Sequence, residues 1–204
     1  MVDWDKRYRE AERPLFGETP NEYLRSVLAR SDVAIGTSLC IGDGDGRNGR
    51  WLARQGIRVT AVDISGVATE KALAADLAQG VEVERIVADV SQWTPPSDTL
   101  WDAVFMVYLQ CDAATRNGAV KRLGRHVAPG GWFVAEGFAP NNSGGGELGP
   151  KVHDLLYERD DLLAALPGFD IIEALKGWIY LAEGERHRGK AWVLRLLARR
   201  SDAG

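Results

Sequence analysis

The stretch Leu39-Cys40-Ile41-Gly42-Asp43-Gly44-Asp45-Gly46-Arg47-Asn48-Gly49-Arg50 decides the fold of this chain. Three glycines at alternate positions follow a short apolar run and precede a helical pattern. Glycine lets the backbone approach a bound ligand closely and adopt positive φ angles. The start of the following helix offers unpaired N–H groups to an anionic or polar ligand. The stretch therefore predicts a loop that binds a nucleotide-containing cofactor.

The glycine loop by itself leaves two classes of cofactor open. Gly44, Gly46 and Gly49 match the dinucleotide fingerprint, but that match is weak without its context. The apolar run at residues 58–63 ends in Asp63. A carboxylate at such a strand end can accept hydrogen bonds from both hydroxyls of a ribose. Both classes of cofactor require this acid, so Asp63 does not separate them.

A second acid favours S-adenosylmethionine over NAD. The strand-like run at residues 83–90 carries Asp89 near its end, where a carboxylate could reach the exocyclic amine of an adenine. A short-chain dehydrogenase needs a tyrosine with a lysine four residues later, and none of the five tyrosines has one. The alternatives that remain are an NAD(P)-dependent oxidoreductase and a non-catalytic protein that binds S-adenosylmethionine.

Strand and helix patterns alternate through the rest of the chain. Strand-like runs at 101–109 and 132–136 flank a helical stretch and the turn Pro129-Gly130-Gly131, which is typical of βαβ units. Two runs near 169–183 and 191–199 are joined by a short turn and are best paired antiparallel. We predict an α/β fold: a Rossmann-like three-layer sandwich whose seven-stranded, mostly parallel sheet ends in an antiparallel C-terminal hairpin.

The predicted organisation is one domain over residues 1–204. Helices at 3–12 and 20–30, the second capped by Thr19-Pro20, are expected to cover the cofactor site. The cofactor-binding core is expected at 37–138. A mobile loop at 139–157 contains three consecutive glycines, which carry a high ordering cost. A C-terminal helix at 158–166 and the hairpin complete residues 158–200.

The chain resembles class I S-adenosylmethionine-dependent methyltransferases, and within them the tellurite-resistance and thiopurine-type small-molecule enzymes. The resemblance covers nearly the whole chain. It rests on these segments: Trp4-Asp5-Lys6-Arg7-Tyr8, the glycine loop, Val62-Asp63-Ile64-Ser65, Ala88-Asp89, Ala128-Pro129-Gly130-Gly131, and residues 183–190 before the run 191–196.

The resemblance implies a set of residues that bind S-adenosylmethionine. The family usually places an acid two residues before the first glycine and often a cysteine after that glycine. Here Cys40 and Asp43 exchange these positions, so Asp43 is expected to contact the methionine end of the cofactor. Trp4 and Tyr8 could form a core pair or a lid over the cofactor. The predicted cofactor residues are Trp4, Tyr8, Gly42, Asp43, Gly44, Gly46, Asn48, Asp63, Ile64, Asp89, Val90 and Val107.

The acceptor of the methyl group decides what further chemistry is needed. A soft nucleophile such as a thiolate, selenite or tellurite needs little beyond alignment. A hydroxyl or amine needs a base, for which His187 and His153 are candidates. Arg186 and Arg188 could hold an anionic acceptor by charge-assisted hydrogen bonds. We predict His187 and Arg188 as catalytic residues, with a solvated turn as the alternative, and His126 as a structural residue at a helix end.

Composition limits the partners. The 204 residues carry a net charge of -4, which gives no general attraction to nucleic acid. Two cysteines in different segments predict neither a disulfide framework nor a metal cluster. The charged N-terminus is unlike a signal peptide, and no apolar run approaches the roughly 20 residues that span a bilayer. We predict a cytoplasmic enzyme acting on a small molecule, without metal, nucleic-acid or membrane partners and with an open oligomeric state.

Overall fold

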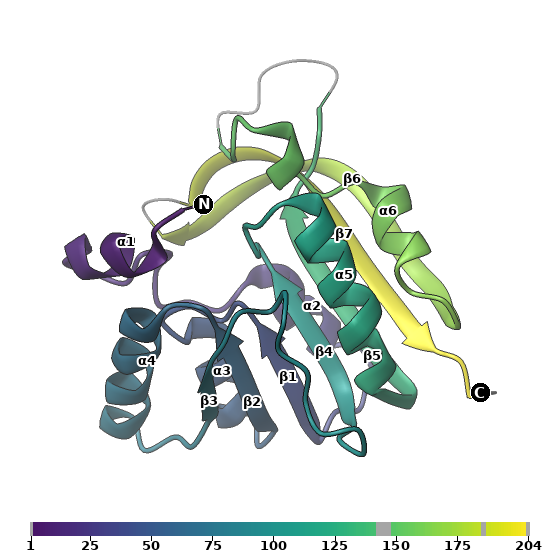
Figure 1. Cartoon of the computed structure of the whole chain (residues 1–204), viewed down its shortest axis with the longest axis horizontal. Coiled ribbons are helices and arrows are strands. Elements are labelled where there is room, and N and C mark those ends of the chain that lie inside the picture. The colour runs from purple at the N-terminus through teal and green to yellow at the C-terminus, as the bar shows by residue number, and fades with distance from the viewer. Residues whose placement is uncertain (1, 142–147, 185–186, 203–204) are drawn as a thin grey trace.

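The computed structural model describes residues 2–141, 148–184 and 187–202. Its seven strands form a single sheet in the order β3-β2-β1-β4-β5-β7-β6 (Figure 1). β7 runs antiparallel to its neighbours β5 and β6, and the other pairs are parallel. The predicted fold class is confirmed. The strands are β1 (Thr37–Ile41), β2 (Arg58–Asp63), β3 (Glu84–Val87), β4 (Trp101–Val107), β5 (Val127–Phe138), β6 (Phe169–Gly184) and β7 (His187–Arg200).

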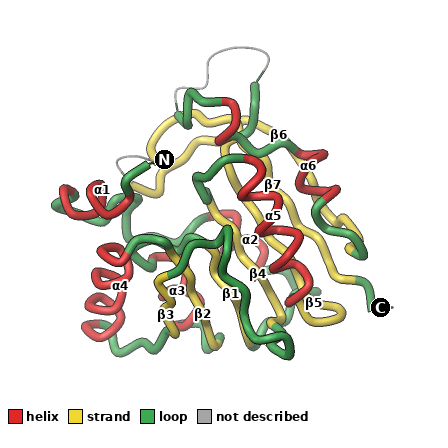
Figure 2. Tube along the Cα trace, in the orientation of Figure 1, coloured by secondary structure: helices red, strands yellow, loops and turns green. Residues whose placement is uncertain are grey.

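Helices cover both faces of this sheet (Figure 2). Because side chains alternate along a strand, Leu39 and Ile41 pack in the core beneath α5 and α6, whereas Cys40 packs beneath α2 and α3. Burial on both faces explains why β1 and β4 are almost continuously apolar. The helices are α1 (Trp4–Glu10), α2 (Glu22–Leu28), α3 (Arg47–Arg54), α4 (Gly66–Ala78), α5 (Ala113–Leu123) and α6 (Arg159–Ala164), with short 3-10 turns at Gly124–His126 and His153–Leu155.

Several predicted boundaries are corrected by hydrogen bonding. The second helix is capped by Asn21 rather than by Thr19-Pro20, because the Asn21 side chain accepts the N–H of Leu24 at 2.9 Å. β3 ends at Val87, so Asp89 lies beyond the strand and not within it. The turn Pro129-Gly130-Gly131 lies inside β5, where the register against β4 shifts.

Helix α1 is attached to α4 through Ser65. The Ser65 hydroxyl accepts the N–H of Ala68, which caps α4, and donates to the Asp5 carboxylate at 2.6 Å. This hydrogen bond, with one from the N–H of Val67, holds the pKa of Asp5 below its ordinary value. The first covering helix is thus docked against α4 (Figure 1).

We expect Ser65→Ala to lower the free energy of unfolding by about 1 kcal/mol, since the helix loses its cap. Urea unfolding followed by circular dichroism measures this change. Ser26→Ala is the matched control, because Ser26 is exposed and its hydroxyl only donates to the carbonyl of Tyr23. Equal stability of the Ser65 and Ser26 variants would contradict the assigned cap.

Candidate cofactor and acceptor site

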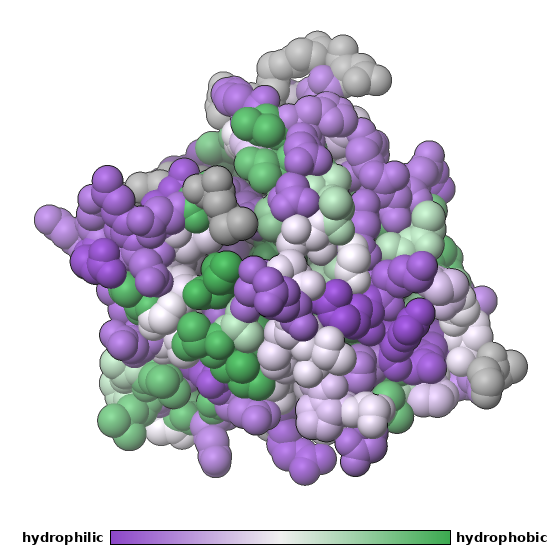
Figure 3. Space-filling model, viewed as in Figure 1, coloured by the Kyte–Doolittle hydropathy of each residue, from purple (hydrophilic) through white to green (hydrophobic). Residues whose placement is uncertain are grey.

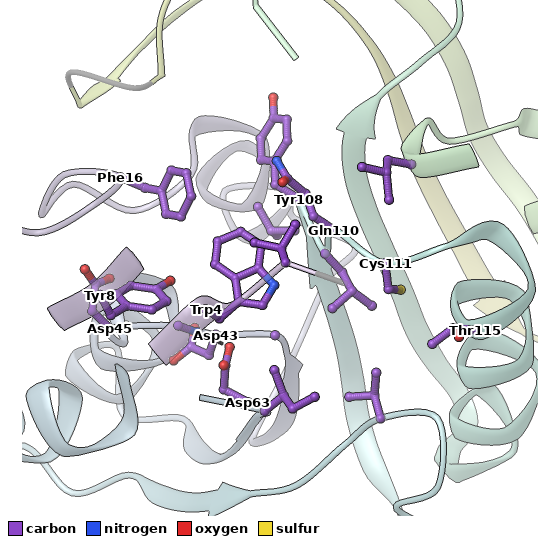
Figure 4. Close-up of a pocket in the computed structure, with 18 of the residues that line it drawn as sticks. Trp4, Tyr8, Phe16, Asp43, Asp45, Asp63, Tyr108, Gln110, Cys111 and Thr115 are labelled. Carbon is purple, nitrogen blue, oxygen red and sulfur yellow. Dashed lines mark hydrogen bonds between the residues drawn. The ribbon is translucent and has the colours of Figure 1, made fainter. Parts of the chain in front are cut away.

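A cavity of about 590 Å³ opens at the carboxyl ends of β1, β2 and β4 (Figure 4). Every predicted cofactor residue except Gly46 lines it. Sites for small molecules typically enclose about 300–1,000 Å³, so this volume suits a cofactor with a small partner. Sequence reasoning missed the remaining lining residues, which are Val2, Phe16, Asp45, Arg47, Ser91, Tyr108, Leu109, Gln110, Cys111, Asp112, Thr115 and Leu155.

The glycine loop is built from backbone that only glycine accommodates easily. Gly44 has a φ of +57°, and a Cβ atom there would lie 2.2 Å from the Tyr8 hydroxyl oxygen. Gly46 has a φ of +87° and caps α3 without lining the cavity. Gly46 therefore turns the chain from the loop into the helix.

Asp63 anchors the loop from the end of β2. Its carboxylate accepts the N–H of Gly44 at 2.8 Å and the N–H of Ser65 at 2.9 Å. Burial raises the pKa of Asp63 to about 6, despite these two hydrogen bonds, which favour the charged form. A partly buried carboxylate with spare lone pairs therefore faces the cavity from the predicted position.

Asp43 lines the cavity, and its carboxylate is held by protein groups. Its carboxylate lies 3.0 Å from Nη1 of Arg85 and accepts the N–H of Gly49 at 3.0 Å, and its side chain is only 2% exposed. Arg85 also pairs with Asp76 of α4. Asp43 thus ties the glycine loop to β3 and α4, and its charge is already engaged by protein. Asp45 also lines the cavity, and among the described residues its carboxylate accepts the N–H of Leu15.

Trp4 and Tyr8 both line the cavity from α1, with ring centroids 6.1 Å apart. Tyr8 is 5% exposed, so it packs in a small core and also faces the cavity. Tyr8 thus packs in a core, as the first alternative expects, and both rings line the cavity, as the second alternative requires.

Exposed apolar side chains gather near α4 and β3 on this side of the molecule (Figure 3), among them Ile64, which is also a lining residue.

His187 is buried at the cavity, so the alternative of a solvated turn is wrong for this residue. It is 2% exposed, and its ring lies 4.8 Å from that of Phe16 and 4.6 Å from that of Tyr108. Its Nδ1 lies 3.6 Å from Oε2 of Glu183. Burial raises the pKa of Glu183, but the interactions with His187 and Arg47 outweigh it and lower that pKa to about 2.

The other predicted acceptor residues lie elsewhere. Arg188 is exposed on β7 and does not line the cavity, because alternate residues of a strand face opposite ways. His153 is exposed and lies 3.5 Å from Glu158, away from the cavity lining. His126 donates from Nδ1 to the carbonyl oxygen of Thr99 at 2.8 Å and does not line the cavity, in keeping with its predicted structural role. Glu185 and Arg186 lie outside the described residues, as do residues 142–147 of the predicted loop.

A buried polar network that sequence reasoning missed joins the covering segments to the sheet. The Asn21 amide donates to Glu136 at 2.7 Å and to Glu183 at 2.9 Å. Glu183 also pairs with Arg47 at 2.7 Å. These partners are up to 162 positions apart in the sequence, so no local pattern could have revealed them.

Comparison with known proteins gives a matching family for the centre of the chain. Residues 39–131 match a family described as "Methyltransferase domain". None of the curated protein sequences matches the chain. In the described part of the molecule no group of three or more His, Cys, Asp or Glu side chains could hold a metal, and no helix is long and apolar enough to cross a membrane.

Solved structures share the fold of this chain. One comes from work on "Conversion of a Disulfide Bond into a Thioacetal Group during Echinomycin Biosynthesis", with a TM-score of 0.78 and 18% identity over 98% of this chain and 91% of that one. TehB from Haemophilus influenzae has a TM-score of 0.69 and 15% sequence identity, over 88% of this chain and 62% of that one. Magnesium protoporphyrin IX methyltransferase from Synechocystis with bound SAH has a TM-score of 0.63 and 19% sequence identity, over 87% of this chain and 80% of that one.

The domain match and the fold agree with the cofactor predicted from the sequence, S-adenosylmethionine. The predicted resemblance to class I methyltransferases is confirmed at the level of the domain and the fold. The predicted likeness to the tellurite-resistance and thiopurine-type subgroup is not confirmed. TehB is only 15% identical to this chain, and that likeness shows the fold alone.

Proposed function

We propose that this protein transfers a methyl group from S-adenosylmethionine to a small-molecule acceptor bound in the same cavity. One observation carries the proposal: the loop and strand-end residues typical of this cofactor share a cavity with a buried histidine from the C-terminal hairpin. Two free cysteines support a reducing, cytoplasmic location.

Residues from separate strand ends would hold the cofactor. Asp63 would accept hydrogen bonds from the ribose hydroxyls, and Asp89 would accept one from the adenine amine. The N–H groups around the glycine loop and the Asp45 carboxylate would receive the methionine end. Side chains from α1 would cover the bound molecule. The remaining cofactor contacts would come from Asn48, Ile64, Val90 and Val107, all of which line the cavity.

When bound, S-adenosylmethionine supplies a sulfonium-activated methyl group that a nucleophile displaces in line. The acceptor lone pair forms the new bond to carbon, while the electrons of the broken S–C bond remain on sulfur. The protein aligns the acceptor and excludes water, which accelerates a step in which a cation becomes neutral. Soft acceptors such as a thiolate, selenite or tellurite would need no more than this.

His187 is the lining residue best suited to remove a proton from a protic acceptor. Burial raises the pKa of Tyr8 and of Tyr108 well above 10.0, so both phenols remain protonated. Burial likewise raises the pKa of Cys111 to about 12. Since Nδ1 of His187 faces Glu183, its opposite nitrogen, Nε2, is the one available to an acceptor.

Binding measurements also test the two alternative functions, an NAD(P)-dependent oxidoreductase and a non-catalytic protein that binds S-adenosylmethionine. A doubly wound dinucleotide-binding sheet has the order 3-2-1-4-5-6, whereas β7 is inserted here between β5 and β6. Calorimetry with S-adenosylmethionine, its demethylated product and NAD should show binding of the first two only. A methylation screen over thiols, phenols, selenite and tellurite should then yield a product. Binding without turnover of any acceptor would favour a non-catalytic binding protein, and binding of NAD alone would favour an oxidoreductase.

We expect the affinity for S-adenosylmethionine to rise as the pH increases through about 6, where Asp63 loses its proton. One proton per binding event gives about a tenfold loss of affinity per pH unit below that pKa. Asp45, whose pKa burial also raises, acts in the same direction. Without cofactor, the Asp63 pKa above its ordinary 3.8 means that its contribution to folding stability is largest at low pH and declines as the pH rises through 6.

Isothermal titration calorimetry between pH 5 and pH 7.5 measures the pH dependence of binding. Asp63→Asn is the control, since an amide does not titrate, and its binding curve should be flatter. An affinity that is independent of pH in the unmodified protein would contradict the assigned role of Asp63.

A further inference from the structure

The end of the cavity beside the hairpin is walled by aromatic rings. Ring centroids lie 6.5 Å apart for Trp4 and Phe16, 4.8 Å for Phe16 and His187, and 4.6 Å for His187 and Tyr108. Figure 4 shows the rings of Trp4, Tyr8 and Phe16 gathered on one side of the cavity, facing Cys111 and Thr115. Aromatic walls of this kind favour flat apolar molecules, which stack on the faces or edges of the rings.

Positive charge at the cavity is already engaged by protein. Of the described lining residues, Arg47 is the one that is permanently cationic. It pairs with Glu183 at 2.7 Å and donates to the carbonyl oxygens of Phe16 and Thr19. Arg7 lies 5.2 Å from the Trp4 ring centroid but does not line the cavity. An anionic acceptor would therefore have to displace an existing ion pair.

Negative charge, by contrast, is present in excess. Among the described residues, four lining carboxylates accept hydrogen bonds from uncharged N–H or hydroxyl groups, and these are Asp45, Asp63, Asp89 and Asp112. Like charges juxtaposed in a site cost several kcal/mol. The cavity thus disfavours oxyanions, although it suits the positive charge of a sulfonium.

We propose that the acceptor is a neutral aromatic molecule with one hydroxyl group, which lies against the wall formed by Phe16, His187 and Tyr108 with its hydroxyl toward His187. This inference rests on the proposed methyl transfer. The O–H proton passes to Nε2 of His187, and the freed oxygen lone pair forms the bond to the methyl carbon, while the electrons of the broken S–C bond remain on sulfur. The products are an aryl methyl ether and S-adenosylhomocysteine. Selenite and tellurite, which resemblance to tellurite-resistance enzymes would suggest, are excluded as preferred acceptors.

The test uses the full chain saturated with S-adenosylhomocysteine and a matched pair of probes. 2-Naphthol and 2-naphthoate share one ring system but differ in charge at pH 7, and selenite supplies a small oxyanion. Calorimetry should show 2-naphthol binding at least about tenfold more tightly than 2-naphthoate, with no measurable binding of selenite. Labelled S-adenosylmethionine should transfer its methyl group to 2-naphthol and not to selenite.

Phe16→Leu removes one aromatic wall and keeps the backbone carbonyl that binds Arg47. It should weaken 2-naphthol binding by about tenfold while changing the Kd of S-adenosylhomocysteine by less than twofold. Tighter binding of 2-naphthoate, faster methylation of selenite or tellurite, or no binding of either naphthalene compound would overturn the proposal. Failure of S-adenosylhomocysteine itself to bind would instead refute the proposed methyltransferase function. The experiment therefore distinguishes a wrong acceptor from a wrong function.

Discussion

Replacing His187 with alanine is expected to reduce kcat for a protic acceptor by about 100-fold or more, while the Kd for S-adenosylmethionine changes little. The imidazole is buried at the acceptor end of the cavity and belongs to the one histidine among the described lining residues. Steady-state kinetics with calorimetry on the same preparation separates the two effects.

The neighbouring Arg188→Ala variant separates a base from an anion-binding turn. Arg188 is exposed on the same strand, so its removal should leave both kinetic constants unchanged. A raised KM with an unchanged kcat in that variant would show that the turn holds an anion. Normal turnover by a folded His187→Ala protein would leave alignment alone as the source of catalysis.

Asp63→Ala is expected to weaken binding of S-adenosylmethionine by about 2–4 kcal/mol, or about 30- to 1,000-fold. The carboxylate would lose its contacts with the ribose hydroxyls, and the N–H groups of Gly44 and Ser65 would lose their acceptor. Calorimetry measures the affinity, and thermal unfolding of the unliganded protein measures the accompanying loss of stability.

Asp102→Ala is the matched control for that loss of stability. Asp102 also accepts two backbone N–H groups, from Gly36 and Thr37, both at 2.8 Å, but it lies at the opposite end of β1 and β4. The Asp102→Ala substitution should therefore lower the free energy of unfolding without changing the affinity for S-adenosylmethionine. Unchanged affinity in the Asp63 variant, with the protein still folded, would show that this strand end does not bind the ribose.

Much of the cofactor half of the site follows from local sequence. A glycine loop between a strand and a helix, and an acid at the end of the next strand, are short patterns whose geometry is set by neighbouring residues. Parallel strands then bring Asp63 and the loop to the same edge of the sheet. For this reason the predicted positions of Gly42, Gly44 and Asp63 agree with the residues that line the cavity.

The acceptor half could not be predicted in the same way. The pairing of Asp43 with Arg85 joins positions 42 apart, and it gives one predicted cofactor carboxylate a partner within the protein. The wall formed by Phe16, Tyr108 and His187 combines the N-terminal segment, the end of β4 and the last hairpin. Each of these residues is unremarkable in its own stretch of sequence.

The sequence by itself determined the order of strands and helices, the cofactor loop and the acid that follows it, because hydrophobic periodicity and glycine conformation act over a few residues. Only the tertiary structure decided that His187 is buried while Arg188 is exposed, and that Glu183, Arg47 and Asn21 meet. Those outcomes depend on how the antiparallel hairpin packs against the rest of the molecule. Burial and ion pairing between distant segments produce no periodic pattern in the local sequence, so they could not be predicted from it.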